Sequence, residues 1–98
     1  MSRPHEPRTH DDAFWAQSLT RQPFYVDGLS FGDYAPAFAL GREHWRDDTL
    51  VEDVLARLGN EWDERKGDSR LTWVEAQHAV RASWERCSAL SHSQWSHA

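Results

Sequence analysis

The fold is decided by residues 49–86, which read TLVEDVLARLGNEWDERKGDSRLTWVEAQHAVRASWER. Apolar residues recur there in two series at intervals of three or four, the spacing that places side chains on one face of a helix. Each series opens with Thr-apolar-Val-Glu, first at Thr49 and again 23 residues later, a pattern typical of an N-terminal capping box. Gly67 separates the two series, and glycine favours the C-terminal end of a helix. We therefore predict two helices, at about residues 50–66 and 73–88.

The two predicted helices depend on each other for stability. The apolar stripe of the first carries five side chains, whose burial contributes roughly 8 to 15 kcal/mol at about 1.5 to 3 kcal/mol each. Ordering one backbone residue costs about 1 to 2 kcal/mol, so this gain does not offset the ordering of the whole helix. The connector from Gly67 to Leu71 is five residues long, which is short enough for an antiparallel αα-hairpin. The predicted core residues of the hairpin are Val54, Leu58, Trp62, Trp73, Val80 and Trp84.

A third helix is predicted at about residues 34–46. Asp33 is a suitable N-cap for it, and Pro36 is tolerated in the first turn, where backbone N–H groups have no partner within the helix. Gly41 lacks a Cβ atom, so we expect another backbone to come close to this helix at that position. The predicted core residues on its one apolar stripe are Tyr34, Phe38, Gly41 and Trp45.

The other segments are less regular. Residues 20–33 alternate turn residues with aromatic ones, which predicts an ordered loop lying on the core. Residues 1–12 are polar and contain two prolines, so we predict a disordered tail, followed after Asp12 by one or two helical turns. Residues 89–98 lose the apolar pattern and are predicted to fray. The chain is thus predicted to be a single all-α domain at residues 13–88, a small helical bundle.

The composition limits the classes of protein. A chain of 98 residues supports one core, and six Trp, four Phe and two Tyr must supply most of its burial. The single Cys87 excludes an internal disulfide, and no apolar run approaches the twenty residues of a membrane span. The N-terminal segment is polar and unlike a secretory signal. We therefore expect no membrane association and a cytoplasmic location.

The acidic residues are concentrated in one segment. The net charge is −5, and residues 43–65 carry eight acidic and three basic side chains. Because affinity for nucleic acid comes largely from Lys and Arg, we expect no nucleic-acid partner. A solvated helix face is the ordinary interpretation of such a segment, and a docking surface for a basic partner is the alternative.

Few residues point to a metal or a catalytic site. Glu75 and His78 form a Glu-x-x-His pair, which di-metal bundles use, but such bundles need two copies and two further glutamates. We interpret the pair as surface residues and keep a metal or small-ligand site at Glu75, His78 and His44 as the alternative. Cys87 falls on an apolar stripe near a helix C-terminus, where a thiol is poorly activated. No catalytic residue and no cofactor are predicted.

The tryptophans are better explained as core anchors than as a ligand-stacking series. Trp62, Trp73, Trp84 and Trp95 recur every eleven residues, close to three helical turns, but Gly67 breaks the series. Aromatic residues in the weakly patterned parts of the chain are candidates for contact with a partner, because Trp and Tyr are frequent in interface hot spots. The predicted binding residues are Trp15, Tyr25 and Trp95.

Several short motifs together cover about three quarters of the chain. They are an Arg-x-Pro-aromatic-aromatic step, an Asp-Tyr-x-Pro-Ala-aromatic-x-x-Gly segment, and two helices whose ends read Trp-Asp-Glu-Arg and Trp-Glu-Arg. The residues that carry them are Trp15, Arg21, Pro23, Phe24, Tyr25, Gly28, Asp33 to Phe38, Gly41, Trp62 to Arg65 and Trp84 to Arg86. In this combination the chain resembles a family of short bacterial proteins of unknown function that are often discussed with stress-response genes. It departs from the family at Gln22, which separates Arg21 from Pro23, and at Leu40, where relatives have an aromatic residue.

The resemblance implies one folded unit and a structural role for Tyr34, Pro36 and Gly41, and it implies no activity. We therefore expect a non-catalytic accessory or stress-associated protein that binds another protein or itself. The alternative is the small metal- or ligand-binding helical bundle described above.

Overall fold

The computed structural model describes the backbone of residues 6–96 and the side chains of residues 11–91. Over this range the chain is helical and contains no strand, which confirms the all-α prediction. A short 3₁₀ turn at Leu19–Arg21 follows the first helix. The α-helices are α1 (Glu6–Ser18), α2 (Phe31–His44), α3 (Val51–Leu58), α4 (Trp62–Arg65) and α5 (Trp73–Ser96).

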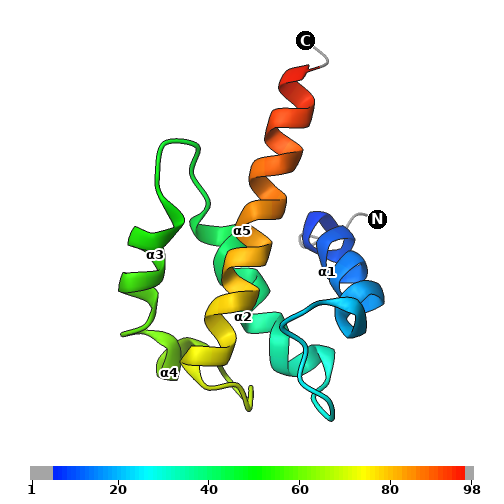
Figure 1. Ribbon diagram of the computed structural model, residues 1–98, viewed down its shortest axis with the longest axis vertical. Coiled ribbons are helices and arrows are strands. Elements are labelled where there is room, and N and C mark those ends of the chain that lie inside the picture. Colours follow the sequence, from blue (N-terminus) through cyan, green and yellow to red (C-terminus); the bar gives the residue numbers. More distant parts are fainter. Residues whose placement is uncertain (1–5, 97–98) are drawn as a thin grey trace.

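The centre of the fold is the pair α2 and α5, which cross each other at Gly41 with both N-terminal ends toward the bottom of Figure 1. Figure 1 shows α5 in front of α2, with α3 and α4 on one side and α1 on the other. A Cβ atom at Gly41 would overlap the Val80 carbonyl oxygen and lie 2.8 Å from the Ser83 Cβ. Beside this contact the Ser83 hydroxyl donates to the Phe38 carbonyl oxygen at 2.7 Å. The close backbone approach predicted at Gly41 is therefore present, and its partner is α5.

The core fills the space between this pair and the other helices. The Trp62 indole N–H donates to the Leu71 carbonyl oxygen at 3.0 Å, and its ring lies 6.0 Å from that of Trp73. The two tryptophans close the end of the core where α4 meets the start of α5. Of the predicted core residues, Trp45 and Trp73 are half-buried, and the buried ones are Tyr34, Phe38, Gly41, Val54, Leu58, Trp62, Val80 and Trp84.

The prediction of a single helix at residues 50–66 is wrong. The chain leaves the helix after Leu58 and turns before α4 at Gly59 and Asn60, two residues of low helix propensity. The Trp73 ring packs against position 59, where a Cβ would be 2.8 Å from Nε1. The first predicted capping box is also absent, since the Thr49 hydroxyl donates to Asp48 at 3.2 Å instead. The second box is present: the Thr72 N–H donates to Glu75 Oε1 at 3.0 Å.

The helix ends also differ from the prediction. α2 begins at Phe31 rather than 34, with Ser30 as its N-cap and Asp33 within its first turn. α1 begins at Glu6, so residues 6–12 are not a tail. Asp11 of α1 lies 3.3 Å from Arg86 of α5, an ion pair between segments that sequence patterns alone do not relate.

α5 does not end at residue 88 but continues to Ser96, so residues 89–96 belong to a helix. The chain has no Pro or Gly after Gly67, and the composition therefore offers nothing to stop the helix. Figure 1 shows this last part of α5 rising beyond the other helices.

We expect Gly41→Ala to lower the free energy of unfolding by about 1 to 3 kcal/mol, because the added methyl group overpacks the contact between α2 and α5. Gly32→Ala is the matched control. It lies in the same helix, and its Cβ would meet nothing closer than the Ser30 hydroxyl at 3.5 Å. Alanine at position 32 should raise stability by about 0.5 to 1 kcal/mol through helix propensity. Urea unfolding measures both, and equal stability of the two variants would contradict the proposed role of Gly41.

Candidate functional site

Two open grooves flank the exposed face of α5. The first, which we call the loop groove, has a volume of about 500 Å³ and lies between the loop at residues 22–24 and α5. The second, the α3 groove, has a volume of about 440 Å³ and lies between the start of α3 and the later turns of α5. Glu85 lines both. The other residues of the loop groove are Gln22, Pro23, Phe24, His78, Arg81 and Ala82, and those of the α3 groove are Thr49, Leu50, Val51, Glu52, Trp84, Ser88 and Ala89.

Tyr34 holds the loop that forms one wall of the loop groove. Its hydroxyl accepts a hydrogen bond from the Val26 N–H at 2.9 Å and donates to the Phe24 carbonyl oxygen at 3.3 Å. Burial raises the pKa of Tyr34, so the hydroxyl remains protonated and able to donate. The loop is therefore fixed to α2 by one side chain, as expected of an ordered loop on the core.

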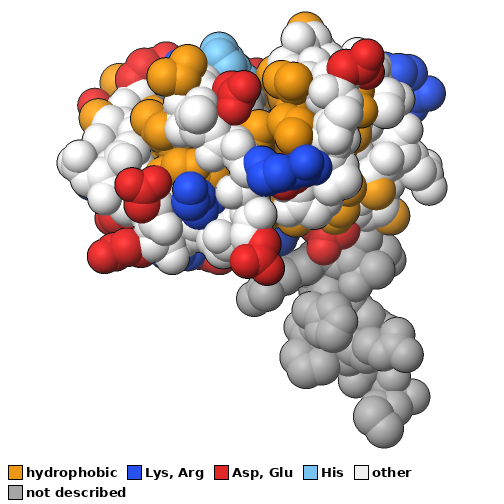
Figure 2. Space-filling view, turned by 90° about the horizontal axis from the view of Figure 1, so that it is seen from below, with side chains coloured by type: hydrophobic (Ala, Val, Ile, Leu, Met, Phe, Trp, Pro, Cys, Tyr) orange, Lys and Arg blue, Asp and Glu red, His pale blue; other side chains and the backbone are white. Residues whose placement is uncertain are grey.

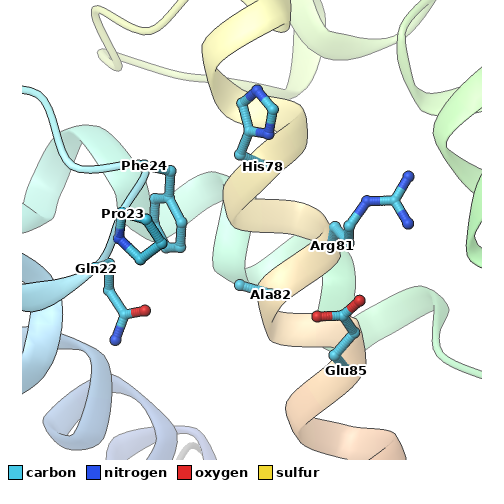
Figure 3. Close-up of a pocket in the computed structure, with 7 residues that line it drawn as sticks. All are labelled: Gln22, Pro23, Phe24, His78, Arg81, Ala82 and Glu85. Carbon is cyan, nitrogen blue, oxygen red and sulfur yellow. The ribbon is translucent and has the colours of Figure 1, made fainter.

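The polar side chains of the loop groove do not converge on a common point. Figure 3 shows Arg81 pointing away from Phe24, Glu85 extending along the helix toward Arg81, and His78 pointing along the helix away from Ala82. The Arg81 guanidinium instead donates to Glu52 of α3 at 3.0 Å. Small-molecule sites place a few polar groups around one apolar volume, and this groove lacks that arrangement.

The α3 groove has an apolar floor and an acidic rim. Trp84 is buried at its base, and Leu50, the N-cap residue of α3, exposes 67% of its surface beside it. The rim carries the carboxylates of Glu52 and Glu85. The hydrogen bond from Arg81 lowers the pKa of Glu52, so this carboxylate is ionised at neutral pH. The lining includes no Lys or Arg.

The structure does not bring the predicted metal ligands together. Glu75 lies in the first turn of α5, where it caps the helix, and His78 is exposed one turn later. His44 is the last residue of α2, and because α2 and α5 run in the same direction, it lies toward the middle of α5 and not at its start. Within residues 11–91, no three His, Cys, Asp or Glu side chains form a group that could hold a metal ion. The proposed Glu75, His78 and His44 site is therefore not formed.

The predicted binding residues have different surroundings. Trp15 is buried, and its ring stacks on Phe38 at a centroid distance of 4.4 Å, so its interpretation as an exposed docking residue is wrong. Tyr25 is half-buried, and its hydroxyl donates to the Leu29 carbonyl oxygen at 3.2 Å, which makes it part of the loop. The side chain of Trp95 lies outside the described residues.

Cys87 is half-buried in α5. Burial and, to a smaller degree, the nearby Asp11 carboxylate raise the pKa of its thiol. A raised pKa keeps the sulfur protonated and poorly nucleophilic at neutral pH. The thiol is thus poorly activated as predicted, but for a different reason: α5 continues to Ser96, so Cys87 lies inside the helix and not near its C-terminus.

An ion pair between the buried Asp33 carboxylate and the exposed Arg70 side chain fastens the segment that leads into α5 to the start of α2. The Asp33 carboxylate accepts hydrogen bonds from the Arg70 guanidinium at 2.7 Å and from the Arg70 N–H at 3.0 Å. It also accepts from the Ser30 N–H at 3.1 Å. These donors, with the Arg70 side chain first, hold the pKa of Asp33 well below its usual range. Sequence analysis identified Asp33 only as a helix cap, because nothing in the local pattern relates it to a residue 37 positions later.

The exposed apolar residues were also missed. Leu50 directly precedes α3 and Val74 is the second residue of α5, and both lie off the apolar stripes. Their exposed fractions are nearly equal, 67% and 68%. Their position off the apolar stripes could have indicated that both side chains are exposed. Only the structure shows that Leu50 lines a groove and that Val74 lines neither groove.

Comparison with protein-family models, with curated proteins and with solved structures yields no match for the chain. None of the described helices is both long and apolar enough to cross a membrane.

The Asp33 ion pair predicts a specific dependence of stability on pH. A carboxyl group with a depressed pKa in the folded state stabilises the fold above the pKa of the unfolded chain, about 3.9, and this stabilisation is lost as the pH falls below it. We expect Asp33→Asn to lower the free energy of unfolding at pH 7 by about 2 kcal/mol.

The difference between the Asp33→Asn variant and the wild type should shrink as the pH falls from about 5 to 3. Asp68→Asn, in the same loop as Arg70 but at an exposed position, is the control and should follow the wild type. Chemical denaturation at several pH values measures these differences. A constant difference between Asp33→Asn and the wild type over that range would show that the ion pair is not the cause.

Proposed function

We propose that the protein is a non-catalytic interaction module that binds another protein through the α3 groove. The observation that carries the proposal is the position of Leu50, which exposes two thirds of its surface directly beside an apolar floor. Folding buries little of this leucine, so it contributes little hydrophobic free energy to the fold. Burial of the side chain against a partner would contribute that hydrophobic free energy to binding.

The projecting part of α5 supports the same surface. α5 forms one wall of the α3 groove through Trp84, Ser88 and Ala89, and the helix continues to Ser96 beyond the other helices (Figure 1). Leu90, in this part, exposes 46% of its surface. Short helical segments without neighbours are marginally stable in water, so a partner packed against this wall would also stabilise it.

The face of the molecule seen from below is a weaker candidate. Figure 2 shows hydrophobic side chains there in separate groups, with basic and acidic side chains between them. Interface cores are depleted of charged residues, and a face with mixed charges between its apolar groups fits a solvated surface better.

The raised pKa of Cys87 and the dispersed polar groups of the loop groove support a role without chemistry. An accessory or stress-associated role, in the cytoplasm, is the part of the proposal that depends on the resemblance in sequence. The buried Tyr34 and the tight contact at Gly41 are compatible with the structural roles that the resemblance implies for them.

Cross-linking in extracts of the native cell, followed by identification of the captured proteins, tests the proposal. We expect one partner to be captured by the wild type and by Val74→Ser, and lost with Leu50→Ser. The two substitutions remove apolar side chains of equal exposure, and neither changes the charge. Circular dichroism and unfolding curves establish that both variants are folded. A protein that stays monomeric at high concentration and captures no partner in a Leu50-dependent way would contradict the proposal.

A further inference from the structure

We infer that the occupant of the α3 groove is a basic amphipathic helix of another protein. This inference rests on the interaction role proposed above and adds to it the chemistry of the partner. It follows from the shape of the groove, from the charges on its rim, and from what those charges exclude.

The shape of the groove suits a helix. One wall is formed by α5 between residues 84 and 89, and the other by residues 49–52 at the start of α3. Ser88 and Ala89, the small residues of the α5 wall, leave room for the side-chain ridge of an incoming helix. Leu50 and Trp84 then offer apolar contacts to the stripe of leucine-like residues that an amphipathic helix carries at intervals of three and four.

The rim carries negative charge that the described residues only partly neutralise. Glu52 is paired with Arg81 at 3.0 Å, whereas Glu85 has no ion pair with any residue among 11–91. Asp53, next to Glu52 in α3, is exposed, and so are Asp47 and Asp48 in the loop that precedes the groove. Acidic surfaces favour partners that place Lys or Arg opposite them, both in the rate of association and in specificity. The acidic segment noted in the sequence therefore adjoins the groove and is not only a solvated face.

The same charges argue against a second copy of this chain in the groove. A symmetric dimer uses the same patch on both subunits, so Glu52 and Glu85 would lie on both sides of the interface, with no Lys or Arg of the groove lining opposite them. Like charges brought together in this way are unfavourable. A nucleic acid is disfavoured for the same reason, because its phosphates are also negative.

Binding of synthetic peptides tests the inference. The probe is a fluorescently labelled helical peptide of about 18 residues, with Leu at helical intervals and Lys elsewhere, measured by fluorescence anisotropy. One control peptide replaces every Lys by Glu, and the other scrambles the Leu positions while keeping the composition. We expect the basic amphipathic peptide to bind at least about tenfold more tightly than either control, and to weaken as salt is added.

Variants of the folded protein then assign the binding to the groove. Leu50→Ser should weaken binding of the basic amphipathic peptide at least about tenfold, as expected for an apolar anchor. Glu85→Gln should weaken it about two- to fivefold, the usual effect of one exposed charge. Val74→Ser, with the same exposure as Leu50 but outside the groove, should leave the affinity unchanged.

Four results would overturn the inference. The first is no binding of the basic peptide at all. The second is equal affinity for the scrambled or acidic peptide, which would show that the helix or its charge is not recognised. The third is an equal effect of Leu50→Ser and Val74→Ser on binding. The fourth is a concentration-dependent dimer that Leu50→Ser abolishes, which would make the occupant a second copy.

The two proposals fail in different ways. If cross-linking captures a partner that depends on Leu50 while the basic peptide does not bind, the interaction role stands and only the chemistry of the partner is wrong. If no capture depends on Leu50, the interaction role itself is wrong.

Discussion

The close approach of α2 and α5 at Gly41 is the contact on which the rest of the structure depends. With no side chain at position 41, the backbone of α5 lies directly against α2, between Val80 and Trp84. The pair runs in one direction, so the start of α2 meets the start of α5 at Asp33 and Arg70. α3 belongs to the segment that connects the end of α2 to the start of α5, and it packs on α5. α1 packs on α2. Each groove lies between α5 and a neighbouring segment, which is the loop at residues 22–24 for the loop groove and the start of α3 for the α3 groove.

Polar contacts set the positions of the irregular segments. Tyr34 fixes the loop at residues 24–26, and Asp33 fixes the segment that leads into α5. Both residues lie in the first turn of α2, so one helix start positions a loop on one side and the entry to α5 on another.

The sequence predicted the parts of the fold that depend on local patterns. The helical stripes, the cap at Thr72 and the need for glycine at position 41 follow from spacing and residue type, and the structure contains them. The break at Gly59 was missed, because the apolar stripe continues across it to Trp62 and outweighed the low helix propensity of Gly59 and Asn60. The pairing of α2 with α5 was also missed, because sequence proximity favoured α3 as the main partner of α5.

The candidate site was less predictable than the fold. Trp15 was interpreted as exposed because its surroundings lack a pattern, yet it stacks on Phe38. Leu50 was interpreted only as part of a helix start. Its exposure was not predicted, because it depends on the position of α5 relative to α3 and not on the local sequence. An acidic docking surface was one of two interpretations of residues 43–65, and the structure adds that an apolar groove lies beside it.

The pairing of α2 with α5 has a consequence for synthesis of the chain. The Ser83 hydroxyl bonds to a carbonyl 45 residues earlier, and Arg70 reaches Asp33 across 37 residues. A nascent chain that ends before α5 holds α2 with its main apolar face uncovered, because the helix that covers it has not yet left the ribosome. Domains emerge from the N-terminus at about 5 to 20 residues per second, so this interval lasts on the order of seconds. Folding of these helices is therefore completed only after α5 has emerged, and the exposed face of α2 is the surface that a chaperone would meet before then.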